Sequence, residues 1–147
     1  MLTKIKTKLY DILSTDLSYN VMDNPYENQE RTFPYVMLTL GNVVRDILKN
    51  NAFQNQIRFK IDIFSDYDGE KEVLEMEQAI FEKINKLYDI PEVTYVRESS
   101  FKIIDDKSTG TVKKHGVIQY TIITSGMYEE VKEEEEEPEN GENSDTN

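Results

Sequence analysis

The stretch Gln56–Phe64 alternates strictly between apolar and polar side chains, and this pattern constrains the fold more than any other feature of the sequence. The apolar positions are Ile57, Phe59, Ile61 and Ile63, and the polar positions between them are Arg58, Lys60 and Asp62. Because successive side chains of a strand point to opposite faces, this period of two predicts a β-strand with one buried and one wet face. The apolar face therefore needs a second layer to cover it.

Two amphipathic segments are suited to form that layer. The first has apolar residues at spacings of three and four, namely Leu2, Ile5, Leu9, Ile12 and Leu13. The second, from about Glu70 to Tyr88, carries a similar stripe of Val73, Met76 or Glu77, Ile80, Phe81, Ile84, Leu87 and Tyr88. Both patterns predict helices packed through one side. We expect the Ser65–Gly69 turn to cap the second helix, and Tyr10 and Phe81 to lie in the core.

The remaining apolar runs predict more strands. Leu17–Met22 is suited to a short strand, and Phe33–Gly41 has proline at its entry, where a missing N–H is tolerated. Val93–Ile104 and Val112–Thr124 are joined by a polar turn with glycine near its end, as in hairpins. The last strand is partly apolar on both faces, which indicates a central position or a cover from a neighbouring subunit. We interpret Asn42–Gln54, hereafter the arm, as a long connection with at most one helical turn.

These elements predict an α+β fold in the order α-β-β-β-α-β-β, with a mainly antiparallel sheet and two helices packed on one face. Residues 1–128 form the predicted domain. Residues 129–147 carry ten acidic residues and one lysine, so the formal charge of −12 leaves only −3 for the rest. Such a composition predicts a disordered acidic C-terminal tail.

Catalytic and metal-binding patterns are weak, and we expect a protein that is not an enzyme. There is no cysteine, and the single histidine, His115, is expected to be an exposed residue at a basic turn exit. The Asp66–Gly69 segment resembles part of a calcium loop, but Phe64 stands where the first carboxylate ligand belongs. We therefore predict no cofactor and no metal. No run approaches the length of a membrane span, and no signal peptide is expected.

The apolar and glycine pattern resembles a known family. Phe33–Leu38 (FPYVML), the long arm, Phe59–Ser65 (FKIDIFS) running into Gly69, and the following helix look like the tail-terminator, or tail-completion, proteins of siphophages. The resemblance covers about Leu2 to Ser125 and leaves the acidic tail unmatched. These are packing motifs, so the resemblance carries over no catalytic residue.

The resemblance implies a structural protein of the virion tail at the head–tail junction, made in the host bacterial cytoplasm. It would form a homohexameric ring that caps the tail tube, stops tube polymerisation and joins the tail to the head. Its partners would be copies of itself, the major tail-tube protein, and the head–tail connector or head-closure protein. DNA would pass through the lumen without specific binding, since the net negative charge disfavours binding to phosphates.

By the same resemblance, the polar loop Asn24–Arg31 and the arm are expected to form ring and neck contacts. Tyr26 and Phe53 stand out because each is an aromatic ring in a polar segment, where a subunit contact would shield it. The candidate interface residues are Asn24, Tyr26, Asn28, Arg31, Arg45, Asp46, Lys49 and Phe53.

Three other interpretations remain open, one of which is a hydrolase with dispersed catalytic residues. The chain could be another neck or tail component, such as a head-closure or tube protein, in which case a tube protein would form open-ended stacks. It could also be a small-ligand-binding α+β module, which would need an apolar pocket with converging polar groups.

Overall fold

The computed structural model describes residues 1–22, 32–106 and 113–127 of the chain. Along the sequence the elements are α1 (Leu2–Asp11), β1 (Asn20–Met22), β2 (Tyr35–Ile47), β3 (Ala52–Ser65), α2 (Lys71–Lys83), β4 (Val93–Asp106) and β5 (Lys113–Met127). A π-helical turn, Ile12–Asp16, continues α1; 3₁₀ turns occupy Lys49–Asn51 and Ile84–Asp89. The α+β class and the predicted order of elements are confirmed.

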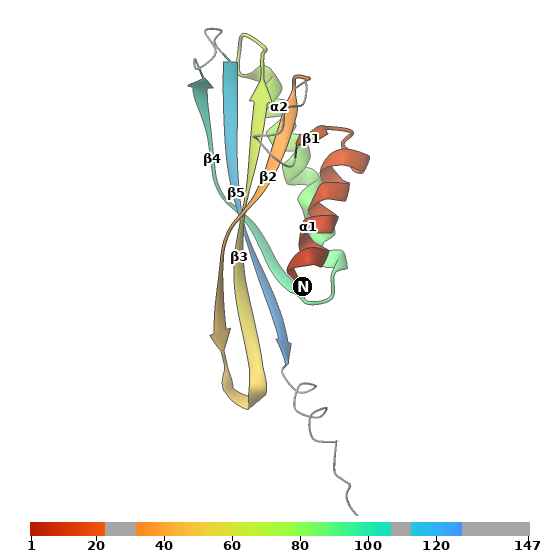
Figure 1. Ribbon diagram of the computed structural model, residues 1–147, viewed down its shortest axis with the longest axis vertical. Helices are drawn as coiled ribbons and strands as arrows, with labels where there is room; N and C mark the ends of the chain where they lie inside the picture. Colours follow the sequence, from red (N-terminus) through yellow and green to blue (C-terminus); the bar gives the residue numbers. More distant parts are fainter. Residues whose placement is uncertain (23–31, 107–112, 128–147) are drawn as a thin grey trace, which may run out of the picture.

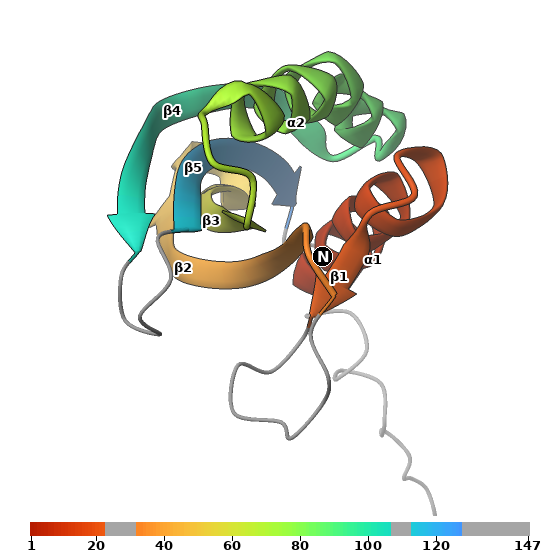
Figure 2. The same ribbon diagram turned by 90° about the horizontal axis from the view of Figure 1, so that it is seen from above.

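The five strands form one mixed sheet in the order β1-β2-β3-β5-β4. The long strands pair antiparallel, while β1 pairs parallel with the start of β2. The last strand, β5, lies between β3 and β4, so its predicted central position is confirmed. Both helices lie on the same side of the sheet (Figure 2).

The core lies between that side of the sheet and the two helices. The alternating residues of β3 and the matching residues of β5 face α1 and α2, and the predicted helix stripes meet them. The buried set includes Ile57, Phe59, Ile61, Ile63, Ile118, Tyr120, Ile122, Ile5, Leu9, Ile12, Leu13, Val73, Met76, Ile80, Ile84 and Leu87. The hydrophobic periodicity thus placed the core correctly, because burial of apolar area is the main favourable term in folding.

A glycine sets how closely α2 approaches the sheet. A Cβ atom built on Gly116 would lie 2.6 Å from Cγ1 of Val73, which is closer than Cβ atoms in proteins approach other atoms. The helix therefore rests directly on the backbone of β5 at this point. A larger residue at position 116 would push α2 outward.

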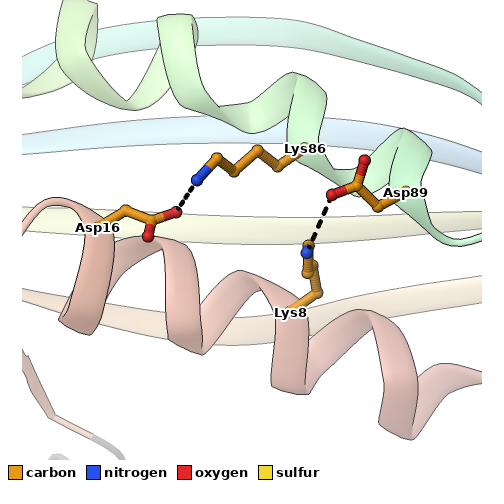
Figure 3. A network of polar contacts seen from close by, with 4 residues as sticks. All are labelled: Lys8, Asp16, Lys86 and Asp89. Atoms are coloured by element: carbon orange, nitrogen blue, oxygen red, sulfur yellow. Dashed lines mark hydrogen bonds and ion pairs between the residues drawn. The ribbon is translucent and has the colours of Figure 1, made fainter.

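Two ion pairs join the helical segments at the surface (Figure 3). Lys8 Nζ lies 3.2 Å from Asp89 Oδ2, and Lys86 Nζ lies 2.7 Å from Asp16 Oδ2. The hydrogen bond from Lys86 holds the pKa of Asp16 below its usual value. Because these pairs are exposed, they orient the helical layer more than they stabilise it.

Three local predictions were wrong. Tyr10, Phe81 and Tyr88 are 41%, 49% and 44% exposed, so none of these rings lies in the core. No side chain caps α2; the Ser65 hydroxyl instead accepts the Tyr67 N–H at 3.1 Å and hydrogen-bonds to Glu72. The arm is also more regular than expected, because β2 continues to Ile47 and β3 begins at Ala52.

Candidate functional site

The arm is a β-hairpin that projects past the helices. It consists of the outer half of β2, the Lys49–Asn51 turn and the first residues of β3 (Figure 1). Asn50 and Asn51 have φ of 62° and 63°, a left-handed conformation that asparagine tolerates well, and this lets the chain reverse. The end of β5 pairs with β3 along the arm as far as Met127, so this part of the molecule has three strands.

Apolar side chains of the arm are exposed on both of its faces. From Thr39 to Ile47 every residue of β2 is exposed, in contrast to the largely buried start of the strand. The exposed apolar side chains here are Leu40, Val43, Val44, Ile47 and Leu48, with Met127 beside them on β5. Ile47 is 63% exposed. Clustered exposure of this kind is typical of a surface that another protein covers.

The arm also offers free backbone groups. β1 pairs only with Tyr35–Met37, so beyond Met37 the described part of β2 has a strand partner on one side only. An exposed strand edge with apolar side chains is a template for pairing with another chain, unless it is covered. Arg45, Asp46 and Lys49 are the charged side chains on this edge and its turn.

Polar contacts hold the arm in shape. Arg45 Nε donates to Asn55 Oδ1 at 2.7 Å, and Asn55 Nδ2 donates to Thr124 Oγ1 at 3.2 Å, so this chain of hydrogen bonds crosses all three strands. The Arg45 guanidinium lies 5.5 Å from the centroid of the Phe53 ring. Phe53 in turn covers Gly126, where a Cβ would lie 2.6 Å from the ring. These contacts therefore stabilise the pairing of the three strands in this part of the arm.

Of the candidate interface residues, Arg45, Asp46, Lys49 and Phe53 lie together on the arm. Phe53 is half-buried by contacts within the chain, so its ring does not depend on a subunit contact for cover. The other four candidates, Asn24, Tyr26, Asn28 and Arg31, lie outside the described residues, as does the acidic tail. Sequence reasoning missed the exposed apolar residues Val43, Val44, Ile47 and Leu48. The sequence did contain a signal for this surface, because these four apolar residues lie close together in a segment that was interpreted as a polar connection.

The side of the sheet that faces away from the helices, hereafter the open face, contains the histidine. His115 Nε2 lies 2.7 Å from Asp62 Oδ1, and its ring stacks on Phe64 with centroids 4.3 Å apart. Lys60 Nζ lies 3.6 Å from the other Asp62 oxygen. The expected exposed histidine is therefore wrong: the ring is half-buried, and it pairs with a carboxylate that is itself buried.

This pair resembles the base-and-orienter half of a hydrolytic triad. Within residues 1–22, 32–106 and 113–127, no hydroxyl side chain hydrogen-bonds to the His115 ring. Its contacts with Asp62 and Phe64 join the ends of β3 and β5, which is a structural role. Over the same residues, no group of three histidine or carboxylate side chains could hold a metal ion.

A second acidic pair lies between α2 and the sheet. Glu98 of β4 hydrogen-bonds to Glu77 of α2, and the Tyr120 hydroxyl lies 3.3 Å from Glu98 Oε1. Burial, together with the hydrogen bond and negative charge of Glu77, raises the pKa of Glu98 to about 7, while the Tyr120 hydrogen bond opposes this. Burial and the nearby Glu98 carboxylate raise the pKa of Tyr120 well above its usual value. The Glu98 carboxyl group therefore keeps its proton to a higher pH than an ordinary glutamate does.

Two shallow pockets lie on the open face, with volumes of about 340 and 170 Å³. They share Arg58 and Gln119, and their linings are polar at most positions.

None of the helices in the described part of the chain is long and apolar enough to cross a membrane. In comparisons with known proteins, no family model and no curated protein matches the chain.

Proposed function

We propose that this chain is a tail terminator of a long-tailed phage: a ring-forming virion protein at the head–tail junction that caps the tail tube and joins it to the head connector. The observation that carries the proposal is the arm, which presents Val44, Ile47 and Leu48 to solvent beside a free strand edge. The family resemblance of Phe33–Leu38 and Phe59–Ser65 supplies the identity of the partners.

A terminator needs complementary surfaces and no bond-making chemistry. The arm meets the first need, because burying each of its half-exposed aliphatic side chains contributes on the order of 1 kcal/mol. The arm's inner bracing by Arg45 and Asn55 means that little order has to be gained on contact, which favours association. In a ring, this hairpin of one copy would contact a different surface of the next copy, because rings are closed by head-to-tail contacts.

The experiment that tests this function is a tube-elongation assay. The major tail-tube protein of the same phage is allowed to polymerise in vitro, and this chain is added during growth. We expect tubes to stop growing with this chain at one end, as seen by electron microscopy with a gold-labelled copy. Tubes that lengthen as if nothing were added would contradict the proposal, and incorporation along their length would identify a tube protein instead.

The matched variants are Val44→Asp/Ile47→Asp in the arm and Leu74→Asp/Tyr67→Asp near α2, where two other large apolar residues are exposed. We expect the arm variant to lose capping and the α2 variant to keep it. Circular dichroism on both shows whether each retains its fold. Equal loss in two folded variants would mean that the arm has no special role.

A further inference from the structure

The open face carries a cluster of cations that the proposed ring does not use. Arg58 of β3 and Arg97 of β4 both pair with Thr121 of β5, so they lie on one rung of the sheet. Paired residues point to the same face, and Arg58 alternates with the core residue Phe59. The two arginines are thus side by side on the open face, about 10 Å apart across β5. Both line the smaller of the two pockets.

Two lysines extend this cluster along the sheet. Lys60 follows Arg58 on the same face of β3, and Lys102 of β4 pairs with Val117, two residues along β5 from Gln119. The only carboxylate among them, Asp62, is buried and already contacts Lys60 and His115. Among the residues that the structure describes, Arg58, Arg97 and Lys102 have no acidic partner. We call these four cations the basic groove.

Polar side chains between the cations complete the groove. Gln119 lines both pockets, and Gln56 and Ser99 line the one between the arginines. Amide N–H groups and guanidinium groups are donors suited to carboxylates, and arginine can bind them through two parallel hydrogen bonds. A net positive groove on a chain of charge −12 selects for an anionic occupant.

We propose that the basic groove binds the acidic C-terminal tail of the same chain, through the glutamate run Glu133–Glu137. The described part of the chain ends at Met127, which pairs with Ala52 at the outer end of the arm. Arg58 lies six positions further along β3, or about 20 Å. Because β5 runs toward the outer end of the arm, the tail must first turn back. A turn of about two residues followed by six extended residues, which span about 20 Å, brings the chain to Glu135.

The geometry favours the tail of the same chain over a separate polyanion. If the tail runs back along the open face, the middle of the glutamate run reaches the level of Arg58, and the residues that follow pass Lys60 and Lys102. Because the tail is tethered beside the groove, its effective concentration is in the millimolar range. Asp46, on the same face near the arm's outer end, disfavours a glutamate run placed nearer to Met127. In this position the tail prevents nucleic acid from binding in the groove.

Photo-cross-linking tests the proposal directly. The chain has no cysteine, so Asn140→Cys gives one attachment site for a benzophenone maleimide on the full chain. A mixture of unlabelled and ¹⁵N-labelled chains distinguishes cross-links within a chain from those between chains. We expect cross-links within one chain, to peptides of β3, β4 and β5 that contain Lys60, Lys102 and Gln119.

Charge variants show whether the groove is responsible. Arg58→Gln/Arg97→Gln should reduce these cross-links at least fivefold, as should about 0.5 M NaCl. Lys6→Gln/Lys71→Gln removes the same charge from exposed positions on α1 and α2 and should leave them unchanged. Cross-links spread evenly over the molecule, or mainly between chains, would overturn the proposal.

Nucleic acid is the competing occupant, and a short fluorescein-labelled DNA duplex distinguishes it. We expect weak binding by the natural chain and at least tenfold tighter binding when Glu133–Glu137 are changed to glutamine. This gain in DNA affinity should vanish when the glutamine substitutions are combined with Arg58→Gln/Arg97→Gln. It should persist when they are combined with Lys6→Gln/Lys71→Gln. Tight DNA binding by the natural chain, unaffected by the tail, would make the groove a nucleic-acid surface and refute tail docking.

Discussion

At the scale of single residues, the most informative side chains are the polar ones held inside the fold. The sequence placed Asp62 on the wet face, yet it is buried against His115, and Glu98 is held between Tyr120 and another carboxylate. Such contacts join residues that are far apart in sequence, so periodicity cannot predict them. They depend on which strands become neighbours.

The raised pKa of Glu98 makes stability fall with pH. Its pKa rises from 4.5 in the unfolded chain to about 7, so between these values the folded state binds more protons. The free energy of unfolding therefore decreases as pH rises through this window. We expect Glu98→Gln to be more stable than the natural chain by roughly 1 kcal/mol at about pH 8, allowing for solvent screening, and little different near pH 4.5.

Urea unfolding at several pH values measures this difference. Glu75→Gln, at an exposed position on α2, serves as the control and should change stability equally little at each pH. A Glu98→Gln advantage that stayed constant with pH would show that Glu98 does not titrate in this window.

A second residue-scale prediction concerns Gly116. Gly116→Ala should destabilise the fold by about 1–3 kcal/mol, because the added Cβ overlaps Val73 Cγ1 and forces α2 away from the sheet. In the double variant Val73→Ala/Gly116→Ala the clash is removed. Its loss in stability should be smaller than the sum of the two single losses, as measured by urea unfolding. Additive losses would mean that α2 adjusts without strain.

At the scale of elements, the sequence predicted the existence and type of both helices and of the long strands, because each has strong periodicity. It failed at the arm, where Val43, Val44, Ile47 and Leu48 also fit a helical spacing. The structure makes this segment a strand because it pairs with β3 residue by residue, apart from an irregularity at Gly41. The parallel pairing of β1 was equally beyond reach, since it depends on a connection made through residues 23–34.

The bracing of the arm leads to a prediction at this scale. Asn55→Ala removes a buried side chain that accepts from Arg45 and donates to Thr124, and it leaves Thr124 without this partner. We expect a loss of about 1–3 kcal/mol in unfolding free energy. Amide hydrogen exchange should rise in the arm and at the end of β5 before it rises in the helices. Faster exchange spread evenly over the chain would contradict a local role.

At the scale of the whole molecule, the chain combines a nearly neutral folded part with a strongly acidic tail. The domain boundary predicted at residue 128 rests on that change in composition. The core described here is complete without the tail, because its buried residues all precede residue 123. We therefore propose that the tail acts through charge and contacts, and that the arm makes the contacts of assembly.

Truncation after Tyr128 tests this division. We expect the shortened chain to keep its circular-dichroism spectrum and its melting temperature within a few degrees, because the removed residues contribute nothing to the core described here. The comparison is made with the full chain at the same salt concentration, since the change in net charge is large. An unfolded spectrum would show that the tail is part of the domain.

We propose that this protein works by closing a ring with copies of itself through the arm. Native mass spectrometry over a range of concentrations tests it most directly. The account predicts one closed species, near 103 kDa for six copies of the 17.2 kDa chain, that does not grow at higher concentration and reverts to monomer in Val44→Asp/Ile47→Asp. A monomer at every concentration and salt, or species that grow without limit, would contradict it.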